Sequence, residues 1–188
     1  MKLSTRLIRR VGATAAAVTA AVLIPAVALA APGRATSAAA PPRCTEAQLQ
    51  TWIGLPGDGT AGTVFYELEI SNVSARTCTL FGFPGVSAVS GDGKQVGSPA
   101  VRSNSHPVRL ITLGRGATAH VDLGIVDVFN FPAAACHPVT VAGLRVFAPN
   151  TFQAQVIQYS FKACQKAGPR FLTVSPAVAG TGIPLFSS

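Results

Sequence analysis

The sequence is poor in the side chains on which most enzymes and metalloproteins depend. It contains seven Asp and Glu residues and three His residues, and its one methionine is Met1. It has no Cys-x-x-Cys pair, which structural zinc sites use, and no Gly-x-Ser-x-Gly turn, which presents the nucleophile of many hydrolases. We therefore expect a protein that is not an enzyme and that binds no metal and no other cofactor.

The chain also lacks a cluster of basic residues. It has fifteen Lys and Arg residues, but four of them lie among the first ten residues, and eleven remain against the seven acids. These eleven are scattered, whereas nucleic-acid-binding proteins gather their basic residues in one patch. We therefore expect no nucleic-acid partner. A mildly basic surface is the favoured interpretation, and attraction to anionic cell-wall polymers is the alternative.

Residues 1–30 have the pattern of a secretory signal peptide. Cations precede an uncharged Ala-, Val- and Leu-rich run, which ends in the small-x-small site Ala28-Leu29-Ala30. Pro25 interrupts the run, which favours a cleaved signal over a membrane anchor. Arg9-Arg10 leaves twin-arginine export open beside the favoured Sec route. We expect a secreted product, free or associated with the cell wall, that does not span the membrane after cleavage.

The remaining chain divides into a leader and one domain. Residues 31–43 are rich in Ala, Pro and Ser and are predicted to form a flexible leader. Residues 44–188 are predicted to form a single domain, which we expect to be monomeric. Its length suffices to bury about two-thirds of the surface of the unfolded chain.

Four cysteines lie in this domain: Cys44, Cys78, Cys136 and Cys164. An even number of widely spaced cysteines outside the cytoplasm indicates two disulfides rather than a zinc site. Three connectivities are possible. We favour Cys44–Cys78 and Cys136–Cys164, in which each cysteine bonds to its neighbour in the sequence.

Alternating apolar and polar residues predict antiparallel strands. The pattern occupies 64–71, 118–125 and 152–156, the last with Phe152, Ala154 and Val156 on one face, and it changes parity at Gly143, which predicts a bulge. Between the strands lie turn signals, which are Gly57-Asp58-Gly59, Gly91-Asp92-Gly93, Gly114-Arg115-Gly116 and Pro149-Asn150. Only Thr45–Trp52 could form a helix. The sequence therefore predicts an all-β protein, an immunoglobulin-like antiparallel β-sandwich with two disulfides.

One segment carries a more specific pattern. It reads Cys78-Thr79-Leu80-Phe81-Gly82-Phe83-Pro84-Gly85-Val86, and it is followed by the Gly-Asp-Gly turn, by Leu113-Gly114-Arg115-Gly116-Ala117 and by Val174-Ser175-Pro176. In this order the chain resembles the actinobacterial secreted family known as domain of unknown function 4232, from Cys44 to about Pro176. The resemblance implies an exported or lipid-anchored sandwich domain with no established activity. This chain lacks the anchoring cysteine of the lipoprotein members.

Single residues in the strands and turns suggest roles of their own. Gly82 and Gly85 favour a structural corner in which Phe81, Phe83 or both fill the core, and a binding loop at Phe83-Pro84 is the alternative. Glu67 and Glu69 share one face of a strand, and His120 and Asp122 share one face of another. We interpret the glutamates as solvent-facing, and Asn72 is expected to shape a turn. A histidine and an aspartate would suit a catalytic triad, so an extracellular hydrolase remains a minor alternative.

The candidate contact site is an uncharged loop before Cys136 that contains Phe129, Asn130, Phe131 and Pro132. If exposed, its phenylalanines would contact a partner in the envelope or the medium. The favoured alternative is that they cover the open end of the sandwich. We expect a noncatalytic binding or structural module. A second hypothesis is a protease inhibitor that presents this disulfide-tethered loop.

Overall fold

The protein is an all-β sandwich, as the alternating pattern predicts. The computed structural model describes residues 39–182, apart from the side chains of residues 55–58 and 60. The predicted signal peptide and most of the predicted leader lie outside this range. None of the helices within it is long and apolar enough to cross a membrane.

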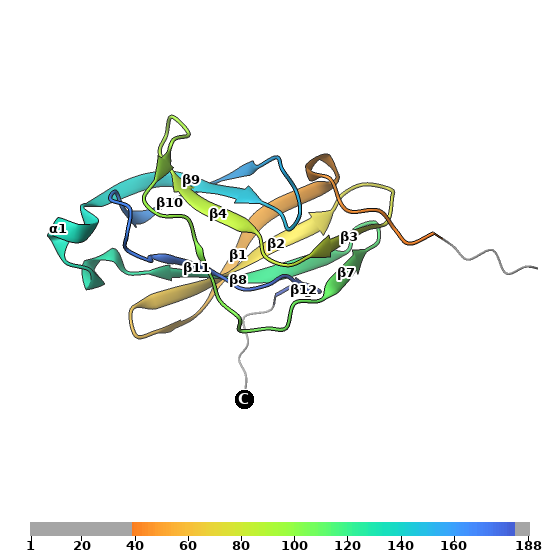
Figure 1. The fold of residues 1–188 in the computed structure, drawn as a ribbon, viewed down its shortest axis with the longest axis horizontal. Coiled ribbons are helices and arrows are strands. Elements are labelled where there is room, and N and C mark those ends of the chain that lie inside the picture. The colour runs from red at the N-terminus through yellow and green to blue at the C-terminus, as the bar shows by residue number, and fades with distance from the viewer. Residues whose placement is uncertain (1–38, 183–188) are drawn as a thin grey trace, which may run out of the picture. The chain divides into compact units, whose positions relative to one another are not determined.

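Two large sheets form the layers of the sandwich, and Figure 1 shows β9, β10 and β4 in one layer with β1, β2 and β8 in the other. The first sheet has the order β1 (Leu49–Thr60), β2 (Thr63–Asn72), β8 (Thr118–Val126), β11 (Leu172–Val174) and β6 (Val101–Arg102), with β12 (Val178–Ala179) also paired to β8. The second has the order β10 (Gln155–Cys164), β9 (Pro138–Phe147), β4 (Gly85–Val89) and β5 (Gln95–Val96). A further pair joins β3 (Cys78–Phe81) to β7 (Leu110–Leu113).

The core lies between the two large sheets. From β2 it receives Leu68 and Ile70, and from β8 it receives Ala119, Val121 and Leu123, all fully buried. These are the inward positions that the alternation predicts for both strands. The opposite sheet contributes Leu144 and Val146, and Phe171 is the largest buried side chain. Burial of this apolar surface from both faces is the main stabilisation of the fold.

The predicted turn at Gly57–Gly59 is wrong. Strand β1 continues through these residues to Thr60, with register shifts at Ile53/Pro56 and Pro56/Gly59. The chain reverses instead at Ala61-Gly62, where both residues have positive φ, 45° and 82°. Two-residue hairpin turns require this conformation, so the glycines before it serve as bulges in a long hairpin.

The predicted inner face of the strand at 152–156 is also wrong. Strand β10 begins at Gln155, Phe152 is 94% exposed, and Val156 points outward. The inner positions are Ile157, Tyr159 and Phe161, because this longer alternation has the opposite parity. The predicted bulge near Gly143 is present, but the extra residue lies in β10, where the register shifts between Gln158 and Phe161.

Short helical segments replace parts of two predicted elements. The possible helix at Thr45–Trp52 is a 3-10 turn, η1 (Glu46–Gln48), followed at once by β1. The segment before Cys136 contains η2 (Val128–Asn130) and α1 (Ala133–Cys136). The prediction that Phe81 or Phe83 fills the core at the Gly82–Gly85 corner is wrong. Leu80 enters the core instead, whereas Phe81 is about half exposed and Phe83 lies beneath the guanidinium of Arg102.

The disulfides are Cys44–Cys78 and Cys136–Cys164, the favoured pairing. The first ties the start of the domain to β3, and the second ties α1 to the end of β10. Both therefore attach a segment without extensive strand pairing to the sandwich. Such crosslinks stabilise the folded chain by about 2–4 kcal/mol each, because they restrict the unfolded ensemble.

Candidate functional site

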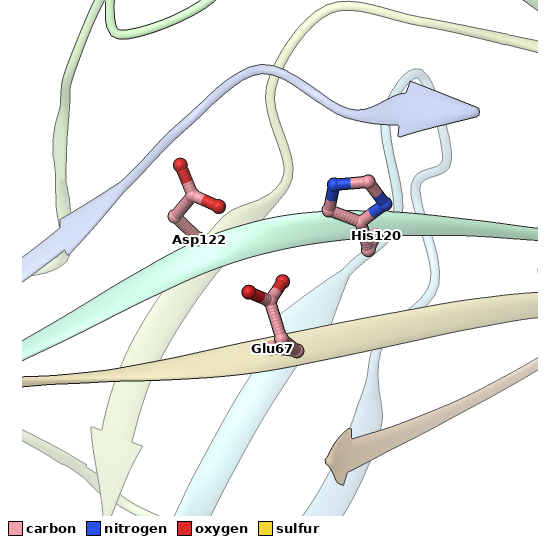
Figure 2. A group of neighbouring side chains, drawn as sticks. All are labelled: Glu67, His120 and Asp122. Atoms are coloured by element: carbon pink, nitrogen blue, oxygen red, sulfur yellow. The ribbon is translucent and has the colours of Figure 1, made fainter. Parts of the chain in front are cut away.

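A polar cluster lies on the outer face of the β2–β8 pair. The two strands are antiparallel, and their register places Glu67 opposite Asp122 and Glu69 opposite His120. Side chains of directly opposed residues point to the same face of a sheet. Four titratable groups therefore meet on the face that points away from the core. Figure 2 shows the side chains of Glu67, His120 and Asp122 converging from the two strands.

The C-terminal segment covers part of this face. After β12 pairs with β8, the amide of Gly180 donates to Thr118 O, and the amide of Gly182 donates to Glu69 Oε1 at 2.9 Å. Glu69 is consequently only 4% exposed, and Glu67 is partly buried. The interpretation of these glutamates as solvent-facing is therefore wrong, because alternation within one strand does not reveal which other segment packs on its outer face.

A hydrogen bond to the backbone orients His120 within the cluster. Its Nδ1 lies 2.9 Å from Gly180 O. A carbonyl oxygen only accepts, so Nδ1 carries a proton, and Nε2 of the neutral ring keeps its lone pair. In Figure 2 one ring nitrogen faces Asp122 and the other points away from it.

A second histidine orients Asp122. His106 Nε2 lies 2.9 Å from Asp122 Oδ2, so the two form an ion pair when the imidazole is protonated. The backbone amide of Asp122 donates to Ser175 Oγ at 2.8 Å. Both the carboxylate and the strand that carries it are thus held in place.

Two carboxylate oxygens in the cluster have no hydrogen-bond partner. Glu67 Oε2 and Glu69 Oε2 are buried, and neither accepts a hydrogen bond within the described residues. Burial raises the pKa of Glu67, and the negative charges of Asp122 and Glu69 raise it further. Burial also raises the pKa of Glu69, which the bond from Gly182 partly offsets. The charged forms of these glutamates are therefore poorly stabilised by their surroundings.

The cluster does not resemble a serine hydrolase site. A triad needs a nucleophile hydrogen-bonded to a histidine, and within residues 39–182 neither His106 nor His120 has a serine partner. Ser175 is buried, and its hydroxyl donates to Pro176 O while accepting from Asp122. All four cysteines are in disulfides. The hydrolase alternative gains no support from this geometry.

An apolar pocket adjoins the cluster. It has a volume of about 320 Å³ and lies between β7 and the segment that contains β12. Leu110, Ile111 and Val178 contribute apolar walls, and Arg109 lines it as well. His106 belongs to both the pocket and the ion pair with Asp122.

The predicted contact loop is a separate feature at the end of the sandwich marked by α1 in Figure 1. Phe129 is 70% exposed, whereas Phe131 is partly buried and packs against the core. Asn130 and Pro132 are exposed. The two phenylalanines therefore divide the roles that sequence reasoning posed as alternatives: Phe131 covers the core, and Phe129 faces outward.

The backbone around Phe129 is firmly held. Asp127 caps η2 by accepting from the amide of Phe129 at 3.0 Å, and the amide of Asp127 donates to Gly62 O at 2.7 Å in the β1–β2 turn. Val128, which precedes Phe129, is fully buried. On the far side the Cys136–Cys164 disulfide fixes the loop. An exposed aromatic ring is thus displayed on a preorganised support.

The structure alone identifies the protein as an all-β sandwich domain with two disulfides. The family model described as Domain of unknown function (DUF4232) matches residues 44–177, and the chain belongs to this family. The match confirms the resemblance expected from the Cys78–Val86 segment and its span. No curated protein and no solved structure matches the chain.

Proposed function

We propose that this protein is a secreted, noncatalytic binding module whose contact site is the loop around Phe129. The observation that carries the proposal is the 70% exposure of Phe129 on a loop held by η2, by the β1–β2 turn and by a disulfide. Exposure of a large apolar side chain to water is unfavourable, so its burial against a partner is favourable. Such side chains on a rigid support are typical contact residues.

Rigidity makes the exposed ring useful for binding. A flexible loop loses conformational entropy when it binds, whereas a loop already fixed in its bound shape loses little.

The surroundings of the loop also suit a protein partner. A hollow of about 250 Å³ lies beside Val128 and is lined by Val64, Tyr66 and Phe161, with Lys162 among its lining residues. An aromatic anchor beside an apolar hollow with polar neighbours matches the composition of protein interfaces.

The two disulfides support secretion as the setting. Disulfides persist in oxidising compartments and are rare in the bacterial cytoplasm. Together with the signal-like residues 1–30, they favour a partner in the envelope or the medium.

The protease-inhibitor hypothesis receives less support. Proteases bind extended segments, and the residues before Cys136 are largely helical.

The test is affinity capture with residues 31–188 as bait against the envelope and secreted proteins of the host. A partner that supports the proposal binds saturably and loses at least about tenfold in affinity with Phe129→Ala. Phe152→Ala is the matched control, because it removes an equally large ring that is 94% exposed elsewhere on the surface. Equal binding by wild type and Phe129→Ala would refute the loop as the contact site, and detection of turnover would refute the noncatalytic role.

A further inference from the structure

The polar cluster contains buried carboxylate oxygens that lack hydrogen-bond donors. Glu67 Oε2 and Glu69 Oε2 are both buried and both without a hydrogen-bond donor in the described residues. Glu69 is more than nine-tenths buried. Its Oε1 accepts from Gly182, and a Cβ on Gly182 would overlap Glu67 Oε2, so both carboxylates border the same residue. Buried carboxylate oxygens without partners are rare and call for a compensating positive group.

The ligand-type atoms of the cluster lie at the spacing of a metal site. One atom from each of Glu67, His120 and Asp122 lies within 4.8 Å of the other two. A zinc ion bonds to carboxylate oxygen and imidazole nitrogen at about 2.0–2.2 Å, so its ligand atoms are separated by about 3–4 Å. Inward movements of up to about 1 Å by the ligand atoms of three partly exposed side chains would close this difference.

The neighbouring hydrogen bonds match those that surround metal ligands. A metal-binding histidine usually donates its second N–H to a backbone carbonyl or carboxylate, which fixes the ring and directs the other nitrogen to the metal. His120 Nδ1 is bonded to Gly180 O in this way. Ligating carboxylates are likewise held by hydrogen bonds, and His106 binds Oδ2 of Asp122. That contact leaves the other oxygen of Asp122 available.

We propose that Glu67, His120 and Asp122 bind one divalent first-row metal ion, with zinc as the best match. One imidazole and two carboxylates suit zinc and its neighbours, whereas calcium takes six to eight oxygen ligands and magnesium keeps most of its water. Glu69 adds negative charge close to the cation without being a required ligand. Three protein ligands leave a coordination position for water or an exogenous ligand.

The experiment is isothermal titration calorimetry. Zinc chloride is titrated into mature protein that has been stripped of metal with a chelator. One equivalent binds to the wild type. Glu67→Gln and His120→Gln each weaken binding by more than about 100-fold, and His106→Gln, which removes only the partner of Asp122, weakens it by about 10- to 100-fold. His137→Asn is the matched control. It removes an exposed histidine outside the cluster, and asparagine tolerates the positive φ of 49° at that position.

A second measurement protects the test against variants that fold poorly. Cobalt(II) added to the stripped wild type acquires the visible absorption of a four- or five-coordinate site, and one equivalent of zinc abolishes it. Absence of stoichiometric binding by the wild type would overturn the proposal. So would binding that persists unchanged in folded Glu67→Gln and His120→Gln, or binding that is lost in His137→Asn, since each result would place the ion elsewhere.

Discussion

The phenolic hydroxyl of Tyr159 in β10 donates a hydrogen bond to that of Tyr66 in β2, with 2.6 Å between the oxygens. The two rings also meet edge to face, with centroids 5.3 Å apart. This contact joins the two sheets of the sandwich. Burial raises the pKa of Tyr159 to about 12, and the hydrogen bond to Tyr66 contributes to the shift.

The raised pKa predicts a loss of stability at alkaline pH. An unfolded tyrosine ionises near pH 10, whereas folded Tyr159 keeps its proton until about pH 12. The folded state therefore binds more protons in this interval, and its stability, which is complete below pH 10, falls as the pH rises toward 12. Urea unfolding between pH 8 and 11 measures the effect. The fall is smaller in Tyr159→Phe. If the free energy of unfolding fell equally with pH in the two proteins, the prediction would be contradicted.

The tyrosines also permit a direct check by absorbance. Tyr66 and Tyr159 are the only two tyrosines in the sequence. The ultraviolet absorbance of tyrosinate therefore reports their ionisation without interference from others. In the folded protein one of the two titrates well above the ordinary range, and unfolding in urea brings both to it.

Asn72→Ala is expected to destabilise the fold by about 3 kcal/mol, because it leaves buried backbone groups without a hydrogen-bond partner. Asn72 is fully buried, and its Nδ2 donates to Arg76 O at 2.7 Å and to Leu113 O at 2.9 Å. Its Oδ1 accepts from the amide of Ser74. Equilibrium urea unfolding measures the loss. Ser74→Ala, which leaves the bond to Leu113 intact, costs less, and an equal cost would show that Asn72 matters only locally.

Gly97→Ala is expected to cost far more than Gly93→Ala. Both glycines have positive φ, 66° and 78°, so both substitutions bear the backbone penalty of about 1 kcal/mol. A Cβ at Gly93 meets open space, whereas one at Gly97 overlaps Cys164 O and presses on the ring of Phe171. We expect about 2 kcal/mol of additional destabilisation at Gly97. Equal melting temperatures for the two variants would contradict this.

Glu69→Gln is expected to stabilise the metal-free protein by about 1 kcal/mol at neutral pH. The substitution removes a buried charge with an unpartnered oxygen, while the amide oxygen still accepts from Gly182. Thermal unfolding with a chelator present measures the gain. Asp92→Asn is the control, since Asp92 is exposed and pairs with Lys94 at the surface. A lower melting temperature for Glu69→Gln would refute the expected gain.

Local alternation predicted the central strands, and the order of the cysteines along the chain favoured the disulfide pairing, although the bonded cysteines lie 34 and 28 residues apart. The alternation at 64–71 and 118–125 identified the inward face of both strands, and cysteine spacing favoured the pairing that is present. The inner face of β10 was missed because Phe152 continued an apolar alternation into a turn. Glycines at 57–59 were read as a turn although they lie in a long bulged hairpin.

The polar cluster was missed for a different reason. The sequence placed Glu67 with Glu69 on one strand face, and His120 with Asp122 on another. Their meeting depends on the pairing of β2 with β8, which are separated by more than forty residues. Coverage by Gly180–Gly182 depends on the return of the C-terminal segment. No local pattern encodes either contact, although two acid- or histidine-bearing strand faces could have been tested for pairing.

The two disulfides have a consequence for how the chain matures. Each joins a cysteine to the next one along the sequence, so the closed loops follow one another and do not interlock. A chain that enters an oxidising space from its N-terminus exposes Cys44 and Cys78 well before Cys136 appears. In a chain exported in this way, oxidation in order of emergence would yield the native bonds directly, without reshuffling of mispaired cysteines.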